Sequence, residues 1–376
     1  MKILSLGSDI NLFKEGSLVS ERIKNYGDLV EELHIINLVD SHHQLLPKQL
    51  FKNVWVYPTN SSSKFTRIFD AIRLGRRLVK DKGFVRGQSL ITAQDLDTGF
   101  AGLWIKRRWR IPLEVQMHTD PFSPYFSGAF NFVRKLFAKT VLRGADGIRV
   151  VSDDLAKRVK EINPKAYIYT LPIYIDKQKW VGEGAKFDIH SLYPWTFIML
   201  AVSRLSVEKN LPMALQCLAK VRETYPNTGL LIVGSGPEES NLKSLVKKLK
   251  LDGFVEFAGW QDDLVSYYRT ANVFIQTSLY EGYGLSLVEA GLNGLPVVTT
   301  NVGLAKELES GKEAYIYPVG RVDLMAQGVI DLINNNYKRE SVSLAFRQFL
   351  DKTLLTKEDY LRSLQESWVK IIGHRI

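Results

Sequence analysis

The sequence predicts an α/β protein with two domains. At 376 residues the chain is long enough for about two domains. Short apolar runs of strand length, such as Lys2–Leu6, Ser89–Thr92 and Leu230–Val233, alternate along it with segments of helical period. Hydrophobic residues make up 45% of the chain and charged residues 24%, so there is enough apolar material to build a full core in each domain.

The first half of the chain contains a regular series of expected strands and helices. Gln94 and Asp95 follow one strand and His118 follows the next, so these polar side chains are expected at one edge of a sheet, where α/β proteins bind ligands. Asp95 is equally well placed to cap a helix. The expected strands are 2–6, 34–39, 54–57, 89–92, 113–117, 148–151 and 168–171, and the expected helices are 17–26, one ending at 80, 129–143 and one ending at 162.

The second half repeats the pattern after a segment, Lys177–Pro194, that has no periodicity and is interpreted as a linker. A final amphipathic helix is expected over 359–373. The expected strands of this half are 196–202, 230–233, 254–257, 273–277 and 296–300, and a helix is expected over 211–225.

The most informative stretch is Glu281–Pro296, which reads EGYGLSLVEAGLNGLP. We expect a helix that starts at Ser286, and the spacing of Ser286 and Glu289 is that of a capping box. The free N–H groups and partial positive charge at such a helix start favour an anion, and the glycines before it let the backbone approach a ligand closely. This stretch therefore predicts a phosphate site.

Three blocks of this chain, in order, resemble the retaining glycosyltransferases of family 4, which have the GT-B fold. Glu281 and Glu289 match the two acids of the family's E-x7-E signature, Val202–Asn210 (VSRLSVEKN) matches its Arg-Lys run, and Gly234–Glu238 (GSGPE) follows an apolar strand. The resemblance implies two Rossmann-like doubly wound domains that face a central cleft. The first is an acceptor-binding domain over 1–180, and the second is a nucleotide-sugar-binding domain over 195–358. A helix over 359–376 would cross back to the first domain.

The resemblance also implies roles for individual residues. Arg204 and Lys209 would bind the donor diphosphate, Glu281 would position the transferred sugar, and His118 would act in the active site. Glu289 would bind ribose hydroxyls, although the capping box is a rival role for it. The remaining donor-binding residues would be Gly234, Gly236, Trp260, Gly282, Tyr283, Gly284 and Leu285.

Structural alternatives exist for several of these residues. Arg204 can instead pair with Glu208, and His118 can be a loop histidine that hydrogen-bonds Asp120. Lys209 can be a surface lysine, and Trp260 can serve packing. Gly303-Leu304 is expected to form a turn near the donor.

Charge is concentrated in the first half of the chain. Residues 1–180 hold 29 Lys and Arg against 18 Asp and Glu, a net of +11, whereas residues 181–376 hold 21 against 22, a net of −1. This asymmetry indicates an anionic membrane surface, an anionic acceptor or nucleic acid as a partner, or simply solubility. We expect no nucleic acid, because no RNA- or DNA-binding motif accompanies the charge.

The expected helix 129–143 offers one route to such a partner. Phe130, Val133, Phe137 and Val141 recur at helical spacing between Arg134, Lys135, Lys139 and Arg143. This pattern suits a helix lying on anionic lipid, and it suits equally a core-facing stripe with a solvated basic face.

The resemblance thus implies a retaining glycosyltransferase that moves a sugar from UDP- or GDP-sugar to a lipid-linked or glycan acceptor of the cell envelope or an exopolysaccharide. The alternatives are another GT-B enzyme, such as an epimerase or a phosphorylase, or a nucleic-acid-binding protein. We expect no cofactor and no metal, and His42-His43 is interpreted as a solvated loop. With one cysteine, Cys217, and no signal peptide or membrane span in the sequence, we expect a cytoplasmic protein, peripheral at the membrane's inner face if the basic half binds lipid.

Overall fold

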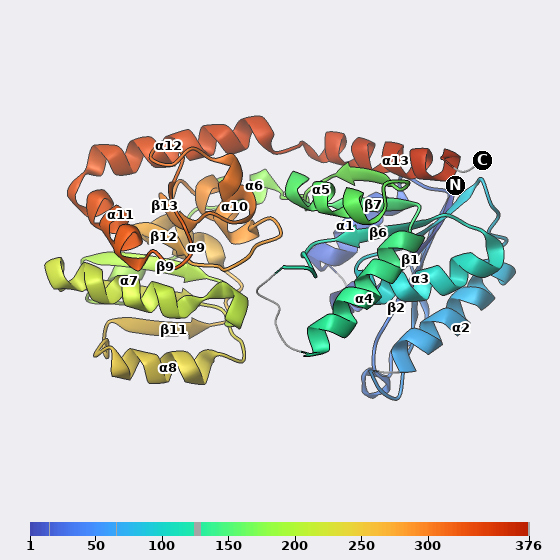
Figure 1. Ribbon diagram of the computed structural model, residues 1–376, viewed down its shortest axis with the longest axis horizontal. Coiled ribbons are helices and arrows are strands. Elements are labelled where there is room, and N and C mark those ends of the chain that lie inside the picture. The colour runs from blue at the N-terminus through green and yellow to red at the C-terminus, as the bar shows by residue number, and fades with distance from the viewer. Residues whose placement is uncertain (15, 65, 124–128, 375–376) are drawn as a thin grey trace. The chain divides into compact units, whose positions relative to one another are not determined.

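The computed structural model describes residues 1–14, 16–64, 66–123 and 129–374 (Figure 1). The chain divides into two compact units. The first unit is Met1–Tyr174 with Leu355–Ile376, and the second unit is Ile175–Leu354. The segment Lys177–Pro194, interpreted from the sequence as a linker, lies within the second unit and holds helix α6 (Lys177–Gly182), which Asp176 caps.

The first unit is built on one eight-stranded sheet in the order β3-β4-β2-β1-β5-β6-β7-β8. All neighbours are parallel except β3 and β4, which are antiparallel. β3 was not expected, because it lacks a continuous apolar run and only extends the edge of the sheet. The strands are β1 (Lys2–Gly7), β2 (Glu32–Asn37), β3 (Lys48–Phe51), β4 (Val54–Pro58), β5 (Ser89–Ala93), β6 (Leu113–Met117), β7 (Gly147–Val150) and β8 (Tyr167–Thr170).

Helices cover both faces of this sheet (Figure 1). On one face, α1 (Leu18–Gly27) and α13 (Lys357–Gly373) share a buried apolar cluster with alternate residues of β1, β2, β4 and β5. On the other face, α2 (Thr66–Asp81), α3 (Leu96–Trp109) and α4 (Ala129–Gly144) pack in sequence, and α5 (Asp153–Ile162) lies beside α4. α13, the last helix of the chain, thus completes the core of the first unit.

The second unit has a six-stranded parallel sheet in the order β11-β10-β9-β12-β13-β14. Its main core lies between alternate residues of the central strands and helices α7 (Leu211–Thr224), α8 (Glu239–Lys248) and α11 (Val322–Asn334). α10 (Leu285–Leu292) packs against α12 (Asn336–Thr353), and α9 (Leu264–Thr270) precedes β12. The strands are β9 (Phe197–Val202), β10 (Thr228–Val233), β11 (Val255–Gly259), β12 (Val273–Gln276), β13 (Val297–Thr300) and β14 (Tyr315–Tyr317).

The strand orders identify where each sheet can bind a ligand. In the second unit the chain runs outward from β9 to β11 and then returns to the other side of β9 with β12. The loops that follow β9 and β12 therefore diverge at a topological switch point, which is where open α/β sheets bind ligands. In the first unit the same reversal falls between β1 and β5.

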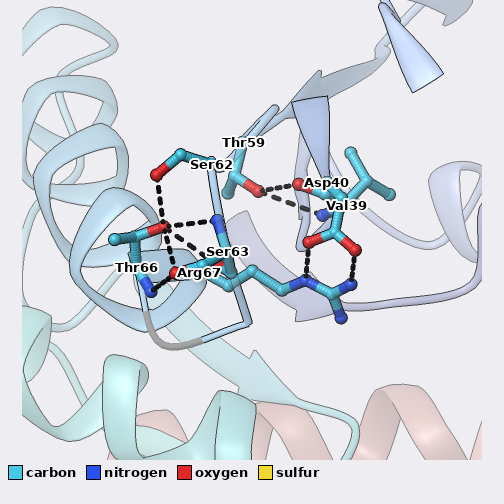
Figure 2. Close-up of polar contacts among 7 residues, drawn as sticks. All are labelled: Val39, Asp40, Thr59, Ser62, Ser63, Thr66 and Arg67. Atoms are coloured by element: carbon cyan, nitrogen blue, oxygen red, sulfur yellow. Dashed lines mark hydrogen bonds and ion pairs between the residues drawn. The ribbon is translucent and has the colours of Figure 1, made fainter. Parts of the chain in front are cut away.

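Polar contacts fix the loops that follow β2 and β4 in the first unit. Figure 2 shows Arg67 of α2 donating to both carboxylate oxygens of Asp40, from Nε to Oδ1 at 2.7 Å and from Nη2 to Oδ2. These bonds lower the pKa of Asp40 below its ordinary value. Ser63 and Thr66 also cap α2 reciprocally, each hydroxyl accepting the other residue's backbone N–H at 3.1 or 3.3 Å. The start of α2 is therefore held to the loop that follows β2.

Candidate functional site

A lysine and a glutamate meet at the switch point of the second sheet. Lys209, in the loop after β9, donates from Nζ to Glu281 Oε1 at 2.7 Å and to Oε2 at 2.9 Å. Ser278, after β12, donates from its hydroxyl to Glu281 Oε1 at 2.7 Å. The Glu281 side chain is 9% exposed and that of Lys209 21%, so Lys209 is not the freely solvated surface lysine that the alternative interpretation expected.

The two loops that carry this pair are bonded to each other. The hydroxyl of Thr277 donates to the carbonyls of Lys209 and Asn210 at 3.1 and 3.0 Å. Asn210 donates from Nδ2 to the Thr277 carbonyl at 3.2 Å. The hydroxyl of Thr300 donates to the Ser278 carbonyl at 2.7 Å, which ties the same loop to β13. The cation and the carboxylate are therefore placed by a braced backbone.

The helix that follows Glu281 begins differently from the expectation. α10 starts at Leu285, and its N-cap is Gly284 in the left-handed region at φ 100°, with no side-chain capping bond. The expected capping box is therefore wrong. Ser286 already lies inside the helix, where its backbone cannot adopt the extended conformation of an N-cap. Because Gly284 has no side chain, the first-turn N–H groups of α10 have no cap from it, and such a helix start favours an anion.

Glu289 is instead held by a tyrosine from a neighbouring helix. The hydroxyl of Tyr268, in α9, donates to Glu289 Oε2 at 2.9 Å. Burial raises the pKa of Glu289 above its ordinary value, and the bond from Tyr268 and the charge of Lys179 oppose that rise. The capping role is thus excluded, and the carboxylate remains oriented by one donor.

The Tyr268 contact gives a pH-dependent prediction. We expect Tyr268→Phe to raise the pKa of Glu289 further, because the hydroxyl stabilises the carboxylate over the carboxylic acid. If Glu289 binds the donor as a carboxylate, KM for the donor will rise as the pH is lowered. In the variant this rise will begin at a higher pH than in the wild type. The measurement is KM and kcat against pH. Superimposable KM profiles would contradict the role of Tyr268.

Arg204 lies in the same loop as Lys209 but is far more exposed. Its side chain is 69% exposed and donates to Glu208 Oε1 at 2.9 Å, so the pairing that the alternative interpretation expected is present. We predict that Arg204→Ala weakens donor affinity and turnover by about ten-fold each, since it removes one charge-assisted contact to a diphosphate. Equilibrium binding of UDP and steady-state kinetics measure the two effects, and wild-type values for both would contradict the prediction.

The glycines after β10 serve close packing of backbone. A Cβ added at Gly234, which has φ 130°, would lie 2.0 Å from the carbonyl oxygen of Ser203, and one at Gly236 would lie 2.3 Å from that of Leu205. The Leu205 N–H also donates to the Ser235 carbonyl at 3.0 Å. Gly234 and Gly236 therefore support the loop that carries Arg204, and a donor contact at either stays a prediction.

The other predicted donor residues differ in how exposed they are. Gly282, Tyr283 and Gly284 are buried, Leu285 is half-buried and Trp260 is 76% exposed, so Trp260 does not serve packing in this unit. Gly303 approaches the motif loop so closely that a Cβ there would lie 2.5 Å from the Tyr283 carbonyl oxygen. The Gly303-Leu304 turn thus supports the loop between Glu281 and α10.

The sequence reasoning missed several polar residues of this site. Ser278, Thr277 and Gln276 form a polar run at the end of β12, and that run was the available signal. Both amide atoms of Gln276 are buried without a hydrogen-bond partner among the described residues. Tyr268 lies on another helix, 21 positions before Glu289, and no motif points to it.

In the first unit, His118 follows β6 and lines a cavity together with Gln94 and Asp95. Asp95 also caps α3, accepting the Thr98 N–H at 2.7 Å, so both expected positions for Asp95 hold. Asp120 pairs with Arg158 at 2.8 Å, and His118 Nδ1 is buried without a partner among the described residues. Burial, followed by the charges of Arg149 and Arg22, lowers the pKa of His118 to about 4, so its ring is neutral at pH 7.

Among the described residues we find no metal-binding cluster, no reactive thiol and no membrane-spanning helix. Among the described residues, no three His, Cys, Asp or Glu side chains gather as a metal ion would require. Cys217 is buried in the core of the second unit, and burial raises the pKa of its thiol to about 12. None of the helices in the described part of the chain combines the length and apolar content needed to cross a bilayer.

Comparison with known families identifies both halves of the chain. Residues 48–171 match the family described as glycosyl transferase 4-like domain, and residues 183–348 match glycosyl transferases group 1. The chain belongs to the family 4 type of glycosyltransferases. The second match contains Lys209, Glu281 and Glu289, and the first contains His118.

Curated proteins with similar sequences are also glycosyltransferases. The chain is 31% identical over 177 residues to an uncharacterized glycosyltransferase of Haemophilus influenzae, covering 46% of this chain and 48% of the relative. It is 26% identical over 221 residues to the lipopolysaccharide core biosynthesis glycosyltransferase LpsE of Rhizobium meliloti, covering 57% and 63%. The chain thus spans about half to two thirds of the length of these curated relatives.

Solved structures show that this glycosyltransferase has the GT-B fold. Anabaena HepE in complex with UDP and glucose superposes with a TM-score of 0.77 at 19% identity, over 98% of this chain and 99% of that one. Sucrose-phosphate synthase from Thermosynechococcus elongatus superposes with a TM-score of 0.79 at 16% identity, over 99% and 100%. The sequence-based prediction of two Rossmann-like α/β domains is therefore confirmed.

Proposed function

We propose that this glycosyltransferase moves a sugar, with retention of anomeric configuration, from a nucleoside diphosphate sugar to an acceptor of the cell envelope or an exopolysaccharide. The observation that carries the proposal is the Lys209–Glu281–Ser278 cluster at the switch point of the second sheet, next to the open start of α10. It combines a cation, a carboxylate and backbone amides, which are the groups needed to bind a sugar diphosphate.

In the proposed reaction the sugar's bond to the diphosphate breaks and negative charge grows on the leaving diphosphate. Lys209, Arg204 and the first-turn amides of α10 stabilise that charge. Glu281 accepts hydrogen bonds from the sugar's hydroxyls, and Glu289 accepts them from the ribose. Because protein cations carry the charge stabilisation, the proposed reaction requires no metal ion.

UDP is the proposed carrier, with GDP as the alternative. The HepE structures were solved with UDP and with UDP-glucose, and that similarity supports the choice. A thermal-shift panel of UDP, GDP, ADP and their sugars tests it, since a ligand that binds the folded protein raises the unfolding midpoint. We expect UDP or GDP to raise the midpoint with EDTA present. No shift with any nucleotide, or a shift only with added metal, would overturn this part of the proposal.

The acceptor is proposed to be lipid-linked or an anionic glycan. The names of several relatives support this class, among them an alpha-monoglucosyldiacylglycerol synthase of Streptococcus pneumoniae and a poly(glycerol-phosphate) alpha-glucosyltransferase of Bacillus subtilis. The net charge of +11 on residues 1–180 agrees with an anionic acceptor or surface. We propose a cytoplasmic enzyme that docks reversibly on the inner face of the membrane.

Helix α4 offers an apolar surface for that docking, although not the one expected. Phe137 stacks on Phe100 with ring centroids 4.9 Å apart, and Val141 is buried, so these two residues face the core. The Phe130 side chain lies outside the described part. Of the expected residues, Val133 is exposed, and the exposed apolar surface is completed by Phe132, at 73%, and Leu136, which were not expected there.

The helix that carries this exposed cluster also carries four cations. Lys135 and Lys139 lie on the same helix, together with Arg134 and Arg143, and suit the headgroup layer of an anionic membrane. Each Lys or Arg near such a surface contributes about 1 kcal/mol. A few of them with three apolar side chains are enough for reversible binding.

We therefore predict co-sedimentation with anionic vesicles and not with zwitterionic ones, falling as salt is added. Charge reversal of Arg134, Lys135 and Lys139 to Glu should abolish binding, and Phe132→Ser with Leu136→Ser should weaken it without changing its salt dependence. The matched control is charge reversal of the exposed Lys160 on α5. If the wild type stays in the supernatant with anionic vesicles at low salt, the protein does not dock on membranes.

A further inference from the structure

The first unit contains a cavity of about 310 Å³ that is lined by His118 and by both polar and apolar side chains. Its floor is one face of the sheet, with Ser5 from β1, Thr92 from β5 and Gln116 from β6. Its walls come from α1, from α13 and from Ile173 and Tyr174 after β8. All lining residues belong to the first unit, so the cavity is a property of that unit alone.

An arginine buried in this wall has no carboxylate partner. Arg149, in β7, is 3% exposed and forms no ion pair with any residue that the structure describes. Its bonds are to neutral groups, from Nε to the Leu171 carbonyl at 3.0 Å and from Nη2 to the Tyr360 hydroxyl at 2.7 Å and the Pro172 carbonyl at 2.9 Å. The carboxylate of Glu114 interacts with it only electrostatically, because its oxygens accept bonds from Tyr169 and Trp368.

A second arginine lines the cavity with no bond to the described part of the chain. Arg22, in α1, is half-buried and forms no hydrogen bond or ion pair with any residue that the structure describes. Asp95 is the one acid of the lining, and its Oδ1 is engaged by the N–H and hydroxyl of Thr98. With His118 neutral at pH 7, the lining carries two positive charges against one negative charge. Neither arginine forms a hydrogen bond to a carboxylate among the described residues, so a ligand with one negative charge could accept charge-assisted bonds from them.

The rest of the lining suits a sugar. Tyr26, Tyr174, Tyr360 and Trp368 present aromatic rings, and the hydroxyls of Tyr26 and Tyr360 lie 3.2 Å apart. Gln94, Gln116 and the unpartnered Nδ1 of His118 add hydrogen-bonding groups. The volume of about 310 Å³ is at the small end of ligand sites, which run from about 300 to 1,000 Å³, and it suits a single sugar ring.

We propose that this cavity binds a single sugar residue that carries one negative charge, a carboxylate or a phosphate, and that this residue belongs to the acceptor. Arg22 and Arg149 bind the charged group, and the tyrosines and glutamines contact the ring. The assignment to the acceptor rests on the proposed function, whereas the binding of the charged sugar does not.

The test measures ligand binding by calorimetry on the full chain, with glucuronate, glucose 6-phosphate, glucose and inorganic phosphate. We expect glucuronate or glucose 6-phosphate to bind, glucose and phosphate alone to bind at least ten-fold more weakly, and saturating UDP not to compete. Binding of glucuronate would identify the charged group of the ligand as a carboxylate, and binding of glucose 6-phosphate would identify it as a phosphate. Equal binding of glucose, or no binding of either charged sugar, would overturn the proposal.

Variants locate the site. Arg22→Gln should weaken binding of the charged sugar by about ten-fold, the loss of one charge-assisted bond, and Arg22→Lys should restore part of it. Lys160→Gln, which removes an exposed cation of the same unit, should have no effect. Wild-type affinity in Arg22→Gln would overturn the assignment. UDP affinity is measured on the same samples, so that the two proposals are tested separately. If UDP binds and the charged sugar does not, only the proposal for the cavity is refuted. If the charged sugar binds and UDP does not, only the proposal for the donor site is refuted.

Discussion

Replacing Glu281 by Gln is expected to reduce sugar transfer by about 100- to 1,000-fold, the range found when one stabilising polar group of an active site is removed. Glu281 accepts bonds from Lys209 at 2.7 and 2.9 Å and from Ser278 at 2.7 Å, so it is held in one orientation. A glutamine keeps the shape but loses the charge and half of the acceptor capacity. In the proposed function this removes the group that binds the sugar's hydroxyls.

Affinity for UDP alone should stay within a few-fold of the wild type in Glu281→Gln, because the proposed contact is to the sugar. The measurements are transfer rate at saturating donor and equilibrium binding of UDP. The matched control is Glu256→Gln on β11, an exposed glutamate of the same unit. Wild-type turnover in Glu281→Gln would show that Glu281 has no role in transfer, and loss of UDP binding would show that it acts by orienting Lys209, the cation proposed to bind the diphosphate.

Lys209→Ala is expected to lower both donor affinity and turnover, with a combined effect on kcat/KM of about 100-fold or more. Its Nζ is the most enclosed of the cations proposed to bind the diphosphate, and Thr277 fixes its backbone through bonds at 3.1 and 3.0 Å. A rigid, partly buried cation stabilises growing charge better than a mobile exposed one, because little reorganisation is needed. The effect should therefore exceed that of Arg204→Ala.

The control is Lys247→Ala on α8, which removes an exposed lysine of the same unit. Lys209→Ala also leaves Glu281 without its cation, so thermal unfolding of each variant must be compared before kinetics are interpreted. A folded Lys209→Ala variant with unchanged affinity for UDP would refute the diphosphate role. An effect no larger than that of Arg204→Ala would contradict the argument from burial.

Much of the fold follows from local patterns in the sequence. The buried parallel strands are near-continuous apolar runs, and their bounds agree with expectation to within one or two residues, as for β6 at Leu113–Met117. β3 and β14 were not predicted, because edge strands such as Lys48–Phe51 carry no such run and exist only by pairing with a neighbour. Helix α3 was suggested only by its cap, Asp95, since its apolar residues are not confined to one stripe.

For the site, the sequence by itself determined which residue types follow which strands. The motif placed Glu281 and Glu289 with seven residues between them, including the glycine loop, and such a spacing can be read from the sequence directly. Only the tertiary structure decided what each side chain contacts. In the structure Lys209 pairs with Glu281, 72 positions away, and Glu289 accepts a hydrogen bond from Tyr268 instead of taking part in a capping box. Phe137 and Val141 of α4 face the core. The tertiary structure also gathers Arg22 and Arg149 around one cavity. The physical reason is that strand order and helix rotation are set by packing of the whole core, so contacts between distant segments are not encoded in any short stretch.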